Sequence, residues 1–111
     1  MAKVNRDAVS RRVKAAREEL GLTATALAEK LGVGRSAYAN WEAKTPKKPN
    51  FPSIEGLATL CELLPGLTLD YLYRGESSHL PLAIGIRLLA RERGLDPDST
   101  SFSPASVLPT P

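Results

Sequence analysis

Apolar residues recur at intervals of three and four near the start of the chain, which is the spacing of an amphipathic helix. One face carries Val9, Val13, Ala16 and Leu20. Arginine, lysine and glutamate side chains occupy most of the other positions. The spacing predicts a first helix over residues 8–20, which ends near Gly21.

Two shorter helices are predicted next. Thr23 is a good N-cap for a helix over residues 24–31, and Gly32 is well placed to end it. A third helix is expected from Arg35 to about Lys44, with Gly34 as a weak N-cap. The inward positions of the second helix are Leu27, Ala28 and Leu31.

The second half of the chain continues the helical pattern after a proline-rich loop at residues 45–52. Ser53 can cap a fourth helix, and Thr68 opens a short fifth helix that ends at Gly75. Leu69 and Leu72 are expected to face inward. The fourth helix has one broad apolar stripe: Ile54, Leu57, Leu60, Cys61 and Leu64.

A sixth apolar segment at residues 80–94 ends in arginines, which suit the C-terminus of a helix. Residues 95–111 are rich in serine, threonine and proline, so we expect a flexible tail there. The chain therefore reads as an all-α protein with a five-helix domain over residues 1–76. An additional C-terminal helix lies within residues 77–94.

Composition narrows the class of protein. The apolar fraction of 42% and the charged fraction of 24% are ordinary for a globular chain. We expect a cytoplasmic protein with no membrane association, because no apolar run approaches the length of a membrane span and the N-terminus lacks a secretory signal. The single cysteine, Cys61, excludes an internal disulfide and a cysteine-based zinc site.

Charge is distributed unevenly along the chain. Residues 1–50 contain eleven lysines and arginines against five acidic residues, whereas residues 51–111 contain four against seven. A basic half raises the expectation of an anionic partner, nucleic acid first, although a basic solvated surface explains the charge equally well.

The second and third predicted helices, joined by a tight turn, have the layout of a helix-turn-helix. If Tyr38 and Trp41 face the core, the outer face of the third helix carries Arg35, Ser36, Ala39 and Asn40. In the major groove an arginine can bond guanine, an asparagine can bond adenine, and an alanine methyl can meet thymine. The helix alone fits the solvated side of an ordinary amphipathic helix equally well.

Residues 11–76 resemble the lambdoid-phage repressor and Cro type of helix-turn-helix protein, the XRE family. The stretches that carry the resemblance are RVKAAREELGLTATALAEKLGV from Arg12, WE at Trp41, KTPKKPNF from Lys44 and LTLDYLYRGE from Leu67. The resemblance implies a lambda-repressor-like fold, a transcriptional regulator of the repressor kind, and a phage or prophage origin.

The resemblance also implies roles for individual residues. Arg17 and Glu42 match a structural ion pair that ties the first helix to the end of the third. The residues expected to read bases are Arg35, Ser36, Ala39 and Asn40, and those expected along the DNA backbone are Thr23, Gly34, Lys44, Lys47, Lys48 and Asn50.

Five positions depart from the family's pattern. Ala24 stands where a glutamine is usual, and Gly34 where a serine or threonine cap is usual. Ala43 and Lys44 replace the usual Asn-Gly turn, and Tyr38 replaces a β-branched aliphatic residue. These differences concern docking on DNA more than the fold.

The leading hypothesis is a sequence-specific regulator that binds double-stranded DNA as a homodimer, because one domain of this size covers only a few base pairs. The candidate dimerisation residues are Leu72, Tyr73, Leu82, Ile86 and Leu89. Packing of residues 82–90 on the core of their own domain is an equal alternative.

Two other function classes were weighed against a DNA-binding regulator. An antitoxin-like or adaptor module would hold a protein partner through residues 80–94, with DNA binding secondary. An enzyme is not expected, and neither is a metal or a cofactor. The sole histidine, His79, is predicted to lie in a linker, and Asp96 and Asp98 in the flexible tail.

Overall fold

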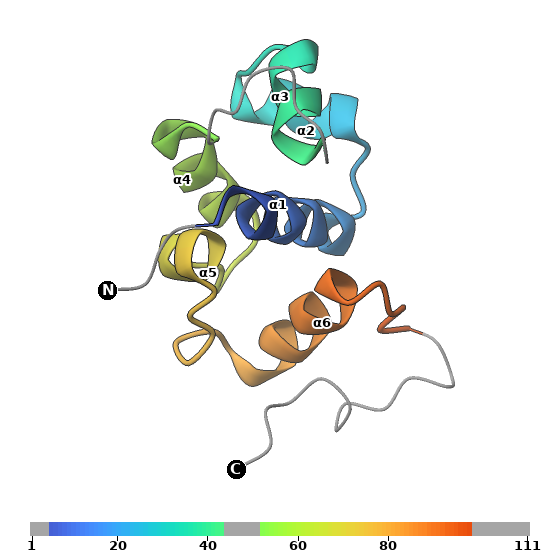
Figure 1. Ribbon diagram of the computed structural model, residues 1–111, viewed down its shortest axis with the longest axis vertical. Coiled ribbons are helices and arrows are strands. Elements are labelled where there is room, and N and C mark those ends of the chain that lie inside the picture. Colours follow the sequence, from blue (N-terminus) through green and yellow to red (C-terminus); the bar gives the residue numbers. More distant parts are fainter. Residues whose placement is uncertain (1–4, 44–51, 99–111) are drawn as a thin grey trace.

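The computed structural model describes residues 5–43 and 52–98, and within these residues every regular element is an α-helix (Figure 1). The predicted all-α class is therefore confirmed. The helices are α1 (Arg6–Leu20), α2 (Ala24–Leu31), α3 (Arg35–Glu42), α4 (Ile54–Leu63), α5 (Leu69–Arg74) and α6 (Leu82–Glu92).

Most helix ends lie where capping residues predict them. The Thr23 hydroxyl accepts a hydrogen bond of 3.1 Å from the amide of Ala26, and Ser53 and Thr68 cap α4 and α5 in the same way. Gly32 ends α2 in the left-handed conformation, with φ of 72°. A residue with a Cβ adopts this conformation only at a cost, so the glycine makes the sharp turn toward α3 favourable. Helix α3 ends at Glu42, two residues earlier than predicted.

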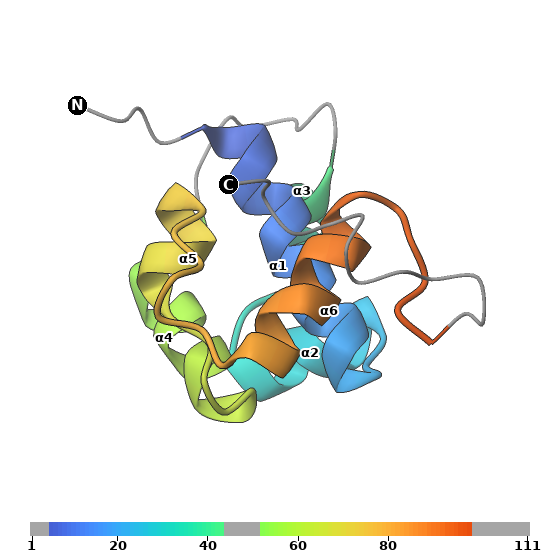
Figure 2. The ribbon, with the colours of Figure 1, turned by 90° about the horizontal axis from the view of Figure 1, so that it is seen from below.

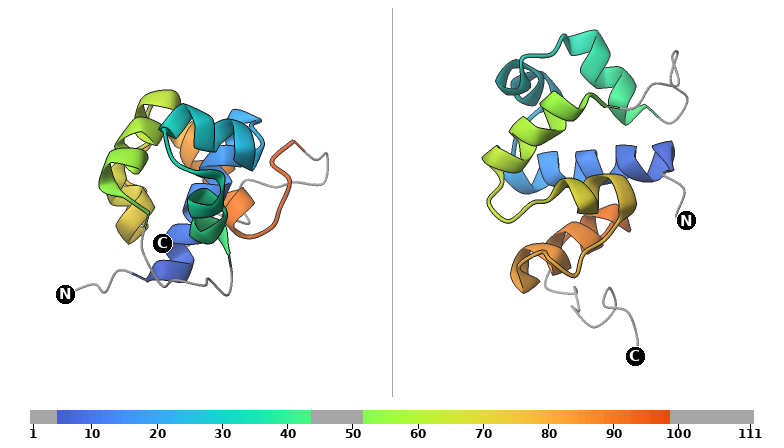
Figure 3. Two further views of the ribbon diagram at one scale, coloured as in Figure 1. Left: turned by 90° about the horizontal axis from the view of Figure 1, so that it is seen from above. Right: turned by 90° about the vertical axis from the view of Figure 1, so that its left-hand side faces the viewer.

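Helix α1 is the centre of the arrangement. It lies between the α2–α3 pair on one side and α6 on the other, as Figure 1 and the right-hand view of Figure 3 show. Helices α4 and α5 close the remaining side of the core. The largest fully buried side chains come from every helix: Val9, Val13, Leu27, Tyr38, Leu57, Leu60, Tyr71, Leu72 and Leu88.

Helix α6 packs on α1 of its own chain (Figure 2). Leu88 and Ala90 are both fully buried. Glu92 accepts a hydrogen bond of 2.7 Å from the hydroxyl of Tyr71 and lies 3.4 Å from the guanidinium of Arg12. Residues 82–92 therefore extend the core of the five-helix domain.

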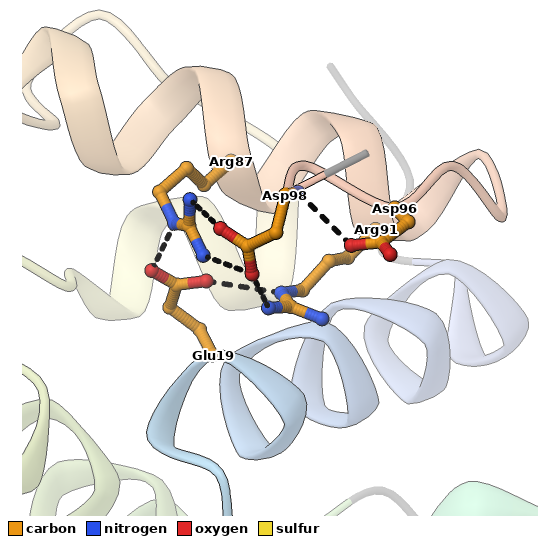
Figure 4. A network of polar contacts seen from close by, with 5 residues as sticks. All are labelled: Glu19, Arg87, Arg91, Asp96 and Asp98. Carbon is orange, nitrogen blue, oxygen red and sulfur yellow. Dashed lines mark hydrogen bonds and ion pairs between the residues drawn. The ribbon is translucent and has the colours of Figure 1, made fainter. Parts of the chain in front are cut away.

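A cluster of charged side chains fastens the outer end of α6 to α1 (Figure 4). Glu19 of α1 binds both Arg87, at 2.5 Å, and Arg91, at 3.0 Å. Asp98, beyond the helix, pairs with Arg87 at 2.9 Å. The flexible tail predicted for residues 95–111 thus includes a carboxylate that lies against α6, a contact for which the sequence has no periodic signal. Residues 99–111 lie outside the described part.

Two predictions about inward positions need correction. Ile54 opens α4 with 59% of its surface exposed, so the apolar stripe of that helix begins at Leu57. Cys61 is half-buried at the edge of the core, and burial raises the pKa of its thiol. The apolar stripe of α4 is therefore broader than the face that the core covers.

Candidate nucleic-acid interface

Helix α3 has a buried side and an outer side. Tyr38 is fully buried, Trp41 retains 6% exposure, and their ring centroids lie 5.5 Å apart. Arg35, Ser36 and Ala39 are exposed. These five residues therefore lie on the sides of α3 that the sequence predicted for them. Asn40 is half-buried, between the buried and the exposed side.

A backbone hydrogen bond closes the turn between the two helices of the helix-turn-helix. Ala28 of α2 is fully buried, and its carbonyl accepts a hydrogen bond of 3.0 Å from the amide of Val33 in the turn. Thr23, at the N-terminus of α2, is exposed, as is Gly34 at the start of α3. Both helices thus begin with backbone amides near solvent, and helix N-termini favour anions.

Arg35 is the one cation of α3. Its side chain is 75% exposed and lies 3.6 Å from Glu29 of α2, whose side chain is 68% exposed. Exposed pairs of this kind contribute at most about 1 kcal/mol. Arg35 can therefore exchange Glu29 for another anion or a base edge at little cost.

The predicted pair of Arg17 and Glu42 is present in a bidentate form, with N–O distances of 2.8 and 3.1 Å. The side chains are 17% and 14% exposed, and Arg17 also donates to the carbonyl of Leu22. The hydrogen bonds that Arg17 donates to the Glu42 carboxylate raise the pKa of Arg17. Burial, with Glu42 nearby, raises the pKa of Tyr38, so its phenol stays neutral.

Sequence reasoning missed the contacts at the C-terminus of α3. Arg6 of α1 donates to the carbonyls of Asn40, Trp41 and Ala43, and the hydroxyl of Ser10 donates to that of Trp41 at 2.5 Å. One indirect signal was present in the sequence. Helix α3 has no basic residue in its last turn and no glycine after it, so its last carbonyls need partners from elsewhere.

Several residues predicted to follow the DNA backbone, namely Lys44, Lys47, Lys48 and Asn50, lie outside the described part of the chain. A hollow of about 310 Å³ lies between α1 and the end of α3 and is lined by Asp7, Ser10, Arg11, Lys14, Glu42 and Ala43.

The predicted dimerisation residues fall in different environments. Leu72 is fully buried in the core of its own chain, so its assignment to a dimer surface is wrong. Tyr73 is half-buried and donates to the carbonyl of Pro52 at 3.2 Å. Leu82 is 71% exposed, and Ile86 and Leu89 are partly exposed. A groove of about 310 Å³ is lined by Ser77, Ser78, Leu80, Leu82, Gly85, Ile86 and Leu89.

Among residues 5–43 and 52–98, no group of three or more His, Cys, Asp or Glu side chains is arranged to hold a metal ion. None of the helices in these ranges is both long enough and apolar enough to cross a membrane.

The fold and the outer face of α3 define a helix-turn-helix protein. A family model described as Helix-turn-helix matches residues 13–72, more than half of the chain, and the chain belongs to this family of DNA-binding regulators. The match begins within α1 and ends within α5, so it leaves α6 outside. Neither the curated proteins nor the solved structures include a significant match.

Proposed function

We propose that the protein is a sequence-specific transcriptional repressor that binds double-stranded DNA with α3 in the major groove. The observation that carries this proposal is the outer face of α3, where Arg35, Ser36 and Ala39 are exposed over a buried Tyr38 and Trp41. Small residues next to one long cation allow the helix backbone to approach base edges closely.

Each residue of the outer face has a distinct role in this proposal. Arg35 donates to the edge of a guanine, and Asn40 bonds an adenine. Ser36 bonds a neighbouring base edge, and the methyl group of Ala39 contacts thymine. Thr23 and Gly34, at the N-termini of α2 and α3, hold phosphates and so fix the orientation of α3 in the groove.

The backbone contacts are proposed to continue into the segment after α3. Lys44, Lys47, Lys48 and Asn50 follow α3 directly in the sequence and would extend the contact along phosphates. Contacts of this kind position the protein and supply affinity that depends on salt concentration, but they carry no sequence information.

We further propose that two copies bind together, each on one half-site. The surface proposed for this contact comprises Tyr73, Leu82, Ile86 and Leu89. Residues 82–86 of α6 contain no charged side chain. The next residue, Arg87, pairs with Glu19 of α1. Because α6 and α3 lie on opposite sides of α1 (Figure 1), a copy on this surface leaves the outer face of α3 open.

Selection of bound sequences from a random double-stranded DNA pool tests the proposal. The purified full chain is used at about 100 mM salt, where non-specific electrostatic binding is reduced. The proposal predicts enrichment of a motif with two-fold symmetry. A folded protein that enriches no motif at any salt concentration would refute sequence-specific recognition.

A second candidate function is supported by the exposed apolar face of α6. An antitoxin-like or adaptor module would use residues 80–94 to hold a different protein, with DNA binding secondary. Sedimentation of the purified chain separates this candidate from the homodimer. A dimer that Leu82→Glu dissociates supports self-association, whereas a monomer at all concentrations favours a separate protein partner.

A further inference from the structure

The C-terminus of α3 is held from outside the helix. An α-helix leaves its last four carbonyls without intrahelical partners, and a following glycine in the left-handed conformation commonly supplies some of the missing donors. Here Ala43 follows α3 with φ of −68° and ψ of 136°, which is extended backbone. The last turn of α3 also contains no basic residue that could interact with the helix dipole.

Arg6 supplies the missing donors from α1. Its Nη1 donates to the carbonyl of Ala43 at 2.6 Å, and its Nη2 donates to the carbonyls of Asn40 and Trp41. The Arg6 side chain is 13% exposed, so these bonds form away from bulk water. A guanidinium at this place meets the negative end of the helix dipole with several donors in one plane.

Ser10 lies one helical turn after Arg6 and completes the contact. Its hydroxyl donates to the carbonyl of Trp41, and the residue is 6% exposed. Arg6 and Ser10 together thus bind the carbonyls of Asn40, Trp41 and Ala43 at the end of α3. The start of α3 is less firmly held, because Gly34 has no side chain to form an N-cap bond.

We infer that Arg6 is a positioning residue for DNA recognition, which sets the direction of α3 without touching DNA. One of the three carbonyls that Arg6 binds belongs to Asn40, a proposed base-reading residue, so loss of Arg6 frees the turn that presents Asn40. The DNA part of this inference rests on the proposed function, whereas the effect on α3 does not.

The test uses the full chain with Arg6→Ala, and Arg11→Ala is the matched control. Arg11 is exposed on the same helix, so its removal changes the net charge equally and leaves the carbonyls of α3 bonded. Hydrogen exchange is read at the amides of the last turn of α3 under conditions where circular dichroism shows all variants folded. Affinity is measured for the DNA motif that selection recovers, over a range of salt concentrations.

Arg6→Ala is expected to speed exchange in the last turn of α3 by about tenfold and to weaken binding to the motif by about tenfold. The salt slope should stay at the wild-type value, because no phosphate contact is lost. Arg6→Lys should recover only part of both effects, since one ammonium cannot reproduce the planar fork of a guanidinium.

Three results would overturn the inference. The first is equality of Arg6→Ala and Arg11→Ala in both exchange and affinity. The second is a salt slope lowered by about one in Arg6→Ala, which would make Arg6 a phosphate contact. The third is faster exchange in all helices alike, which would make the effect one of general stability. If the wild-type chain selects no DNA, the proposed function fails while the exchange data still decide whether Arg6 holds α3.

Discussion

Helices α3 and α6 pack on opposite sides of α1, and they differ in what they expose. Helix α3 presents Arg35, Ser36 and Ala39 over an aromatic interior, whereas α6 presents Leu82 with 71% of its surface exposed. Their attachments differ as well. Arg6, Ser10 and Arg17 of α1 hold the end of α3, while Glu19 holds α6 through two arginines.

One central helix, α1, thus supports two surfaces of different chemistry, one on α3 and one on α6. The outer face of α3 combines a cation with small polar residues, which suits base edges and phosphates. The outer face of α6 is apolar, which suits a protein surface. Variants on one side of α1 should therefore leave the proposed contacts of the other side intact.

The largest effect is expected for Glu42→Ala, which leaves Arg17 without its bidentate partner. The pair is only 17% and 14% exposed, so an uncompensated cation should cost about 3 kcal/mol of unfolding free energy. Urea denaturation measures this loss. The double variant Arg17→Met with Glu42→Leu should recover much of the loss, and a single variant as stable as wild type would show that the pair does not hold α3.

Arg35→Ala should weaken binding to the selected DNA motif by about 1 to 3 kcal/mol and relax the preference at one base pair. Stability should be unchanged, because Arg35 is 75% exposed and only its surface pair with Glu29 is lost. Fluorescence anisotropy with single-base variants of the motif measures both quantities. Leu82→Glu is the control on α6, and it should leave affinity for an isolated half-site unaltered. An unchanged base preference in Arg35→Ala would mean that the assignment of α3 residues to bases is wrong.

Lys47→Ala and Lys48→Ala should weaken binding to every DNA sequence alike. Each lost phosphate contact should lower the slope of log affinity against log salt by about one. Titrations at several salt concentrations, with the motif and with a scrambled duplex, give the slopes. Slopes equal to that of wild type would remove this segment from the interface.

Glu29→Gln should strengthen DNA binding slightly, by less than about 1 kcal/mol. The variant removes a carboxylate from the α2 surface beside Arg35, which frees the guanidinium and reduces repulsion of phosphates. Affinity for the selected motif is the readout, and Glu62→Gln, an exposed carboxylate of α4, serves as the control. Weaker binding by Glu29→Gln than by wild type would indicate that Glu29 orients Arg35 productively.

The smallest effect is expected for Asp98. Its hydrogen bonds with Arg87 lower the pKa of the Asp98 carboxyl below its usual value. A lowered folded-state pKa gives a contribution to stability that is complete above the unfolded pKa, about 3.9 for aspartate, and is lost as the pH falls through the folded value. An NMR titration of the Asp98 carboxyl measures its pKa in the folded protein and should find it lowered. A carboxyl that titrates at the ordinary aspartate pKa would show that the pair does not form in solution.

The sequence predicted the helices well because their ends are fixed locally. Thr23, Ser53 and Thr68 form the capping bonds expected of them, and Gly32 takes the left-handed conformation that the turn requires. Apolar spacing also placed Tyr38 and Trp41 in the core. These features depend on residues within one or two turns of one another.

The contacts of Arg6 and Asp98 could not be predicted from spacing. Arg6 reaches carbonyls more than thirty positions away, and Asp98 reaches α6 from beyond its end. The short fifth helix did carry a local signal for Leu72, which was expected to face inward and is buried. Its separate assignment to a dimer surface had no such signal behind it.

Amide chemical-shift mapping of the full chain with the selected DNA motif tests the central claim most directly. A half-site duplex, which binds one copy, removes changes that arise from association of two copies. Binding through α3 predicts large shifts at the start of α2 and along Arg35 to Asn40 of α3, with small shifts from Leu82 to Leu89 of α6. Shifts concentrated on α6, with α3 unperturbed, would contradict it.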